Sequence, residues 1–281
     1  YRSSRGLGDV YKRQYFHTRR ETLSVHNIGG ENVPRVFSDL SGLKKITPEN
    51  LAPLGYLYSV EEDKWHISDQ AVDYVYIGNN QINFELPGLL MAIQNHSVWV
   101  DNSSSFPIFS IHEYNDNISK SKTLNFIHVK EKQLQPDLIH ILQTDKTVVI
   151  ILDYDDKYTI MSHRDFIIDI ILGGFRTPVI IQKDYANVPS SEFQLDSSID
   201  LSSLLIDGLI DGLSLRSDTG QGLSNQTSFG ILQASRLRIS KTEYISCPSC
   251  GRTLFDLQST TNEIRSVTCL LYTSPSPRDD R

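Results

Sequence analysis

Short apolar runs alternate with amphipathic segments along residues 70–217. The continuous β-branched runs at 146–154 and 177–182 are typical of strands buried on both faces, as in parallel sheets. The segment between them, 162–174, has a helical pattern, with a possible N-cap at Ser162 and a Gly-Gly pair at its end. Strands that alternate with helices predict an α/β fold with a parallel sheet.

The same patterns assign the other segments. Strands are predicted at 73–78, 96–100, 106–111, 123–129 and 211–217. Helices are predicted at 84–95 (weakened by Pro87 and Gly88), 135–144, 198–210 and 225–240. Residues 15–46 are polar and irregular, and we interpret them as a linker or as the remnant of a preceding domain.

The number of strand and helix units matches half or more of a (β/α)₈ barrel. We therefore expect a partial or complete TIM-barrel-like domain. An open doubly wound sheet has the same alternation, and the sequence does not distinguish the two.

The two ends of the chain look foreign to it. Residues 1–14 and 269–281 resemble translated sequencing-adapter sequence and have no sustained period of 2 or 3.6, so we expect artefactual, dispensable tails. They carry six Lys or Arg and three Asp, and without them the net charge changes from −7 to −10. An acidic protein of this kind is not expected to bind nucleic acid nonspecifically, because that requires a basic surface.

The composition limits the cellular context. There is no apolar run of about 18 residues, so we expect no membrane span, and no secretory signal pattern is visible. Three cysteines cannot form a disulfide framework, which favours a reducing compartment. We expect a cytoplasmic protein of a bacterium.

Most candidate chemistry in the chain is weak. The acidic segment 153–156 (DYDD) follows a predicted strand, where α/β enzymes place functional loops, but acidic turns of this kind are more often solvated. The eight histidines are scattered without a metal-binding spacing and are expected to be structural or superficial. No complete phosphate-binding loop and no nucleophile elbow occurs.

The strongest signal is the pair Cys247 and Cys250, at C-x-x-C spacing in a chain with one other cysteine, Cys269. Two such thiolates can reach one metal ion and form half of a tetrahedral site. The pair alone is compatible with half a zinc site, half an iron–sulfur site, a redox dithiol or coincidence. The redox dithiol is disfavoured because no thioredoxin-like βαβ pattern surrounds the pair.

The sequence around this pair resembles a known family. TEYISCPSCGRTLFDLQ (242–258), with LLIDGLIDGLSL (204–215) and QTSFGILQASRLRISKTEY (226–244) before it, is similar to the cluster segment of the 4-hydroxy-3-methylbut-2-en-1-yl diphosphate synthase family in its long, three-domain form. The match is specific over about 204–268 and weaker over 50–203, where it rests on position and alternation.

The resemblance implies a domain plan. Residues 37–240 would be the barrel-like insert domain of the long form, and 241–268 the beginning of a small α+β iron–sulfur domain. The catalytic barrel, with the residues that grip the substrate phosphates, would precede this chain, so we expect a fragment that is inactive alone.

The resemblance also implies a cofactor and partners. Cys247 and Cys250 would be the first two of three Cys ligands of a [4Fe–4S] cluster, with the third Cys and a Glu ligand beyond Thr268. The family reductively opens 2-C-methyl-D-erythritol 2,4-cyclodiphosphate in non-mevalonate isoprenoid biosynthesis, with ferredoxin or flavodoxin as electron donor, and a homodimer is expected. The alternatives are a zinc-binding β/α scaffold module and an unrelated β/α enzyme that uses the DYDD loop.

Overall fold

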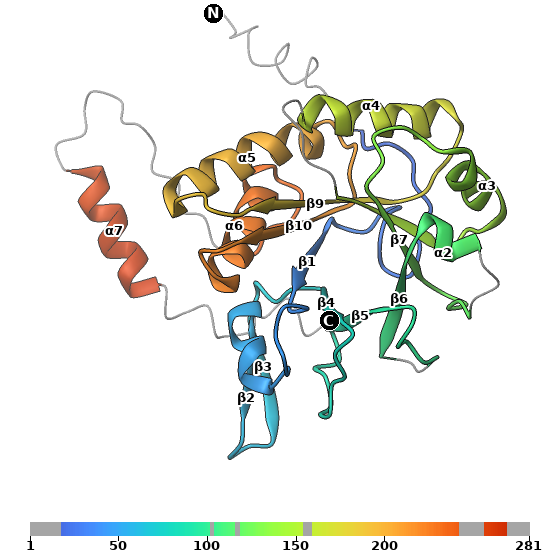
Figure 1. The fold of residues 1–281 in the computed structure, drawn as a ribbon. Coiled ribbons are helices and arrows are strands. Elements are labelled where there is room, and N and C mark those ends of the chain that lie inside the picture. Colours follow the sequence, from blue (N-terminus) through green and yellow to red (C-terminus); the bar gives the residue numbers. More distant parts are fainter. Residues whose placement is uncertain (1–17, 102–103, 116–118, 154–158, 242–255, 269–281) are drawn as a thin grey trace, which may run out of the picture. The chain divides into compact units, whose positions relative to one another are not determined.

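The computed structural model describes residues 18–101, 104–115, 119–153, 159–241 and 256–268. Eight parallel strands close into a barrel in the order β1-β10-β9-β8-β7-β6-β5-β4 (Figure 1). They are β1 (Arg35–Asp39), β4 (Tyr74–Gly78), β5 (Met91–Asn95), β6 (Ser105–Ser110), β7 (Asn125–Val129), β8 (Val148–Leu152), β9 (Val179–Tyr185) and β10 (Gly212–Ser217). The barrel prediction is confirmed, in its complete form, and the open doubly wound sheet is excluded.

Helices follow the last five strands of the barrel. They are α2 (Ile111–Asn115), α3 (Pro136–Thr144), α4 (Thr159–Leu172), α5 (Ser190–Ile206) and α6 (Gln221–Ala234). Between β1 and β4 the chain forms the 3₁₀ helix η1 (Pro48–Leu54) and an antiparallel hairpin of β2 (Tyr56–Ser59) and β3 (Lys64–Ile67), which extends from the barrel (Figure 1). The described residues up to Ser240 form one compact unit, and α7 (Leu257–Thr268) belongs to a second.

Alternation along the strands divides the core into two apolar layers. In β8, Val149 and Ile151 belong to the cluster inside the barrel, whereas Val148, Ile150 and Leu152 belong to the cluster between strands and helices. This is the pattern of a strand buried on both faces, and it explains why the run reads as uninterrupted apolar sequence.

Two predictions about the first half of the chain were wrong. Residues 84–95 are not a helix: a loop reaches Leu90 and β5 begins at Met91, because Pro87 and Gly88 interrupt the segment. In place of a helix, Ile82, Phe84 and Leu86 pack against the outer apolar cluster. Residues 96–100 form a turn rather than a strand.

The interpretation of residues 15–46 as an irregular linker was also wrong for its described part. Residues 35–39 form β1, which closes the barrel between β10 and β4. Before it, Val25 and Ile28 pair with each other through backbone hydrogen bonds and pack into the inner apolar cluster. Residues 18–34 therefore cover the N-terminal end of the barrel.

Three helices begin earlier than their patterns predict. Helix α4 starts at Thr159 rather than at Ser162, α5 at Ser190 rather than at 198, and α6 at Gln221 rather than at 225. In α5 and α6 the first turn is mostly polar, so no apolar pattern marks where the helix begins. In α4 the serine at 162 looked like a cap, although Ile160 and Met161 already belong to the helix.

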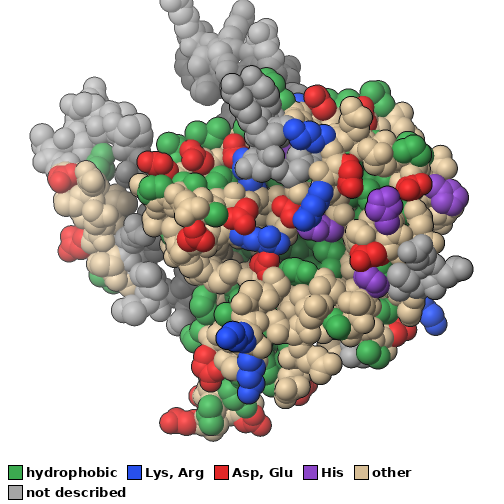
Figure 2. Space-filling model, in the orientation of Figure 1, with side chains coloured by type: hydrophobic (Ala, Val, Ile, Leu, Met, Phe, Trp, Pro, Cys, Tyr) green, Lys and Arg blue, Asp and Glu red, His purple; other side chains and the backbone are tan. Residues whose placement is uncertain are grey.

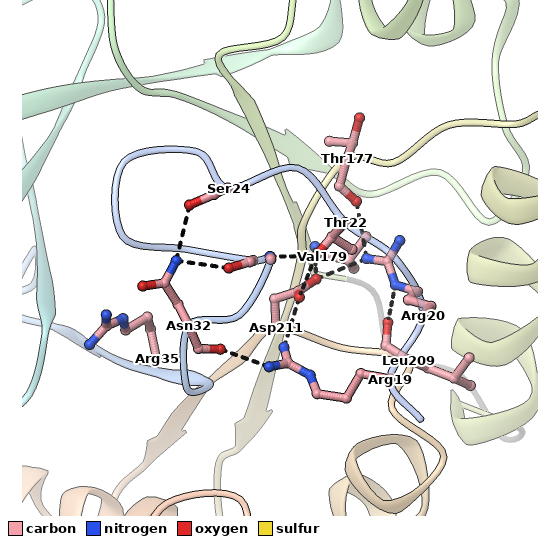
Figure 3. Close-up of polar contacts among 12 residues, drawn as sticks. Arg19, Arg20, Thr22, Ser24, Asn32, Arg35, Thr177, Val179, Leu209 and Asp211 are labelled. Carbon is pink, nitrogen blue, oxygen red and sulfur yellow. Dashed lines mark hydrogen bonds and ion pairs between the residues drawn. The ribbon is translucent and has the colours of Figure 1, made fainter. Parts of the chain in front are cut away.

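Asp211, in the turn before β10, organises the N-terminal end of the barrel (Figure 3). Its carboxylate lies 2.9 Å from Arg19 Nη2 through one oxygen and 2.9 Å from Arg20 Nη2 through the other. It also accepts hydrogen bonds from Thr22 Oγ1 (3.2 Å) and from the backbone N–H of Val179 (3.0 Å). Asp211 thus ties the N-terminal segment to the first residue of β9.

Asp73 repeats this arrangement on the other side of β1. It immediately precedes β4, and its carboxylate accepts a hydrogen bond from the backbone N–H of Val36 at 2.9 Å. Arg35 Nη1 lies 3.0 Å from one oxygen and Arg238 Nη1 2.5 Å from the other. Each aspartate therefore precedes one strand, binds the backbone of another and forms ion pairs with two arginines.

Gly212 allows β1 and β10 to approach each other at this end. A β-carbon there would lie 2.6 Å from the Arg35 carbonyl oxygen and 2.8 Å from Ile180 Cδ1. Both contacts are closer than real β-carbons make, and one is to backbone. Position 212 therefore requires glycine because the neighbouring strands lie so close to it, and not because of the geometry of the preceding turn.

We predict that Asp211→Ala destabilises the barrel by about 3–5 kcal/mol, because it leaves the buried Arg20 without its counter-charge. Burial already lowers the pKa of Arg20, and Asp211 opposes that shift. Urea unfolding followed by circular dichroism measures the loss. Asp169→Ala, at an exposed position on α4, is the matched control and should change stability by less than about 0.5 kcal/mol. Equal effects of the two variants would contradict the structural role of Asp211.

Two Gly→Ala substitutions should act with opposite sign. Gly212→Ala should destabilise by about 1–3 kcal/mol, because the methyl group enters occupied space. Gly230→Ala should stabilise by about 0.5–1 kcal/mol, since Gly230 is exposed in α6, a methyl group there would meet nothing within 4 Å, and alanine favours the helix. Thermal unfolding of both variants tests this pair, and destabilisation by both would refute the argument.

Candidate functional site

A ring of polar side chains occupies the C-terminal end of the barrel. Every second residue of a strand points into the barrel. At the C-terminal end of each strand the last of these inward-pointing residues is polar: in β7 it is His128, two residues after Phe126, and at the end of β8 it is Asp153, two residues after Ile151. The eight positions are Asp39, Tyr76, Asn95, Ser110, His128, Asp153, Gln182 and Arg216. In barrels of this architecture the C-terminal end is where active sites lie.

Six residues of this ring, all except Asp39 and Asp153, line a cavity of about 270 Å³. Its apolar floor includes Phe37, Ile93, Ile151 and Ile180 from the barrel interior. Its walls are mostly amide, hydroxyl and imidazole groups. Figure 2 shows acidic, basic and histidine side chains gathered near the centre of the face drawn there, with hydrophobic atoms set between them.

His128 and Asp153 form a pair at one side of the cavity. His128 Nε2 lies 2.7 Å from Asp153 Oδ2, and both side chains are about three-quarters buried. Burial raises the pKa of Asp153, but the hydrogen bond and charge of His128 and the charge of Arg216 outweigh it, so that the pKa lies below its ordinary value. Asp153 therefore stays ionised and orients the imidazole, which is the usual relation of a carboxylate to a functional histidine.

Arg216 and Asp39 form a second pair, with Arg216 Nε 2.7 Å from Asp39 Oδ2. Nearby, Tyr76 donates a hydrogen bond to Asn95 Oδ1 at 2.7 Å, and Asn95 donates to Asn79 Oδ1 at 2.7 Å. Burial and the Asp39 charge raise the pKa of Tyr76, against the opposing effects of Arg216 and Asn95, so its hydroxyl stays protonated.

His96 is held from two sides. Its ring stacks on Phe109, with centroids 5.2 Å apart and an interplanar angle of 19°, and its Nδ1 lies 3.6 Å from Glu113 Oε2. The backbone N–H of Ser110 donates a 2.7 Å hydrogen bond to the same carboxylate oxygen. That bond, with a smaller contribution from His96, lowers the pKa of Glu113 despite partial burial. The imidazole is thus fixed at the cavity wall.

The predicted metal ligands Cys247 and Cys250 lie outside the described residues, so their arrangement stays a prediction. Of the DYDD segment, Asp153 is described, and it joins the polar ring. Within the described ranges, no group of three or more His, Cys, Asp or Glu side chains is placed to hold a metal ion. The helices of those ranges also include none that is long and apolar enough to cross a membrane.

Sequence reasoning missed His96 and His128, which were expected to be structural or superficial. A signal for His128 was present, because Leu124, Phe126 and His128 alternate along one face of a predicted strand. A polar residue that ends such an inward series faces the mouth of a barrel. His96 had no comparable signal, since it lies in a turn that was predicted to be a strand.

We predict that Asp153→Asn destabilises the barrel by about 1 kcal/mol at pH 6, because it removes a charge-assisted hydrogen bond from a partly exposed pair. A carboxyl whose folded pKa is lowered contributes stability above its ordinary pKa of about 4 and loses it as the pH falls further. The difference between wild type and variant should therefore shrink below about pH 4. Urea unfolding at pH 6 and pH 3.5 measures it, with Asp184→Asn, at an exposed position of β9, as control. A difference that does not vary with pH would contradict the assignment.

We compared the sequence and the fold with those of known proteins. No protein-family model matches the sequence. Among solved structures, a GH30 endoxylanase from Clostridium papyrosolvens C71 aligns over 75% of this chain and 74% of its own, with 6% identity and a TM-score of 0.41. The barrel assignment rests on the strand pairing of this chain and not on that alignment.

Curated relatives are closer in sequence. The 4-hydroxy-3-methylbut-2-en-1-yl diphosphate synthase (flavodoxin) of Parabacteroides distasonis is 37% identical over 252 residues, and that of Bacteroides thetaiotaomicron is 31% identical over 254. Each alignment covers 89% of this chain and 38% of the relative. That of Protochlamydia amoebophila is 48% identical over 91 residues. The chain, which spans a little over a third of the first two of these proteins, is a partial-length relative of the 4-hydroxy-3-methylbut-2-en-1-yl diphosphate synthases.

Proposed function

We propose that this chain is part of a 4-hydroxy-3-methylbut-2-en-1-yl diphosphate synthase, an iron–sulfur oxidoreductase of non-mevalonate isoprenoid biosynthesis. The protein that contains it converts 2-C-methyl-D-erythritol 2,4-cyclodiphosphate to 4-hydroxy-3-methylbut-2-enyl diphosphate. The observation that carries this proposal is the 37% identity to such a synthase over 89% of the chain. Since only about a tenth of the chain is left unaligned, the alignment includes most of the barrel.

Cys247 and Cys250 are the proposed cluster ligands in this chain. Thiolates at C-x-x-C spacing suit iron–sulfur clusters, and Arg252 adds a positive charge close by in the sequence, which favours the thiolate form. The cluster, when bound, supplies the electrons for reductive ring opening. A third Cys and a Glu would complete its ligands. The printed names of the relatives favour flavodoxin over ferredoxin as electron donor, and a homodimer is the proposed assembly.

The barrel of residues 35–217 is proposed to be the insert barrel of the long form, with the substrate phosphates bound elsewhere in the protein. The charges at its mouth support this assignment. A diphosphate is usually bound by several cationic or N–H donor groups together. Among the described residues that line the cavity, Arg216 is the single lysine or arginine, and it is paired with Asp39.

Iron binding tests the proposal. The longer protein that contains this sequence should bind iron and acid-labile sulfide in the ratio of a [4Fe–4S] cluster after anaerobic reconstitution. Cys247→Ser and Cys250→Ser should each reduce both contents strongly, because a closed site loses affinity with each missing ligand. The matched control is Ser249→Ala, between the two cysteines, which should leave the contents unchanged.

The 281-residue chain gives a second measurement. With two cluster ligands it should retain much less than stoichiometric iron, and Cys269→Ser should not change that amount. Stoichiometric zinc in the longer protein, without iron or sulfide under anaerobic preparation, would reject the synthase and favour a zinc-binding module. A cluster that survives both cysteine substitutions would reject the ligand assignment alone.

A further inference from the structure

The cavity at the barrel mouth has no role in the function proposed above, yet it has the chemistry of a binding site. Its walls combine the side-chain amides of Asn79, Asn95 and Gln182 with hydroxyl groups and two imidazoles. Amide and hydroxyl groups both donate and accept hydrogen bonds, so they match partners that do the same. Ligand pockets commonly place such groups around an apolar floor, as this one does.

Charge limits which ligand can enter. Asp39 balances Arg216, Asp153 faces His128, and Glu113 faces His96. Apart from the two imidazoles, these side chains comprise three carboxylates and one guanidinium. An anionic ligand would therefore meet repulsion and, in the described lining, no uncommitted lysine or arginine. The balance favours a ligand without negative charge.

Gln182 provides the most specific feature. Its side chain lines the cavity and is 7% exposed. Its Nε2 makes no hydrogen bond of good geometry, although the amide is near enough to Asp153 to lower the pKa of that carboxyl. A buried amide N–H without an acceptor is costly, whereas a ligand hydroxyl oxygen would satisfy it. The Gln182 amide would therefore bind a ligand oxygen that accepts a hydrogen bond deep in the cavity.

Size sets the last limit. A cavity of about 270 Å³ lies just below the range of about 300–1,000 Å³ that holds drug-sized ligands. A single sugar ring or a short polyol would fit, with its C–H groups on the floor of Phe37 and Ile93 and its hydroxyls toward the amides. We propose that the C-terminal mouth of this barrel binds a small neutral polyhydroxylated molecule through Gln182, Asn95 and His96.

Ligand-observed NMR with the 281-residue chain tests this proposal, using D-glucose and ribitol as neutral compounds and glucose 6-phosphate as the anionic analogue. At least one neutral compound should bind, and glucose 6-phosphate should bind about tenfold or more weakly than glucose. Gln182→Leu should weaken binding by about tenfold or more, as expected where a site loses a buried hydrogen-bond donor to its ligand. Gln143→Leu, at an exposed position of α3, is the matched control and should bind as wild type does.

His96→Phe provides a second variant if Gln182→Leu does not fold. It keeps an aromatic ring to stack on Phe109 and removes both ring nitrogens, so it should weaken binding while preserving thermal stability. The proposal is overturned if neither neutral compound binds, if glucose 6-phosphate binds as tightly as glucose, or if binding survives the folded variant unchanged. None of these outcomes bears on cluster binding by the longer protein, so the two proposals can fail separately.

Discussion

Closure of β1 between β10 and β4 is the constraint on which this barrel depends. A sheet whose strand order ends at β10 on one side and β4 on the other closes only if β1 pairs with both. Asp73 fixes the junction with β4 because its carboxylate accepts a hydrogen bond from the backbone of β1, and Asp211 fixes the junction with β10 because its carbonyl oxygen accepts one from the Arg35 N–H. The Asp211 carboxylate also binds the backbone of β9, and each of the two carboxylates pairs with two arginines. Gly212 permits the required approach to Arg35. Ion pairs, backbone hydrogen bonds and the absence of a side chain at Gly212 thus all stabilise the N-terminal end of the barrel.

This division between the two ends of the barrel has a functional consequence. Buried ion pairs secure the N-terminal end, where Arg20 and Asp211 are almost completely buried. At the C-terminal end, partly exposed pairs such as His128–Asp153 also join neighbouring strands, but other polar groups, such as Gln182 with its unpartnered Nε2, do not. Such groups can be committed to a ligand without loss of the fold, as in barrels generally, where stability and function occupy opposite ends.

The sequence predicted the barrel well where both faces of a strand are apolar, as in β8 and β9. It failed where an element depends on distant partners. Strand β1 is short and follows a polar segment that is ordered by Asp211, 192 residues away from Arg19, so no local pattern marks it. The first half of α5 was missed because its buried face passes through the small Ser197, between Phe193 and Leu201. The polar ring was partly predictable, since a period of two continued from Phe126 and Ile151 reaches His128 and Asp153.

The two parts of this chain that carry chemistry are incomplete in different ways. The barrel mouth has a full ring of hydrogen-bonding groups but no uncommitted Lys or Arg among its described lining residues, so it is unsuited to a diphosphate. In the proposed synthase, the cysteine segment would supply two thiolates of a four-ligand site. In the proposed synthase, both the phosphate-binding cations and the remaining cluster ligands would therefore come from other parts of the protein. The barrel would be free to bind a neutral molecule, because the charge of the reacting substrate is met elsewhere.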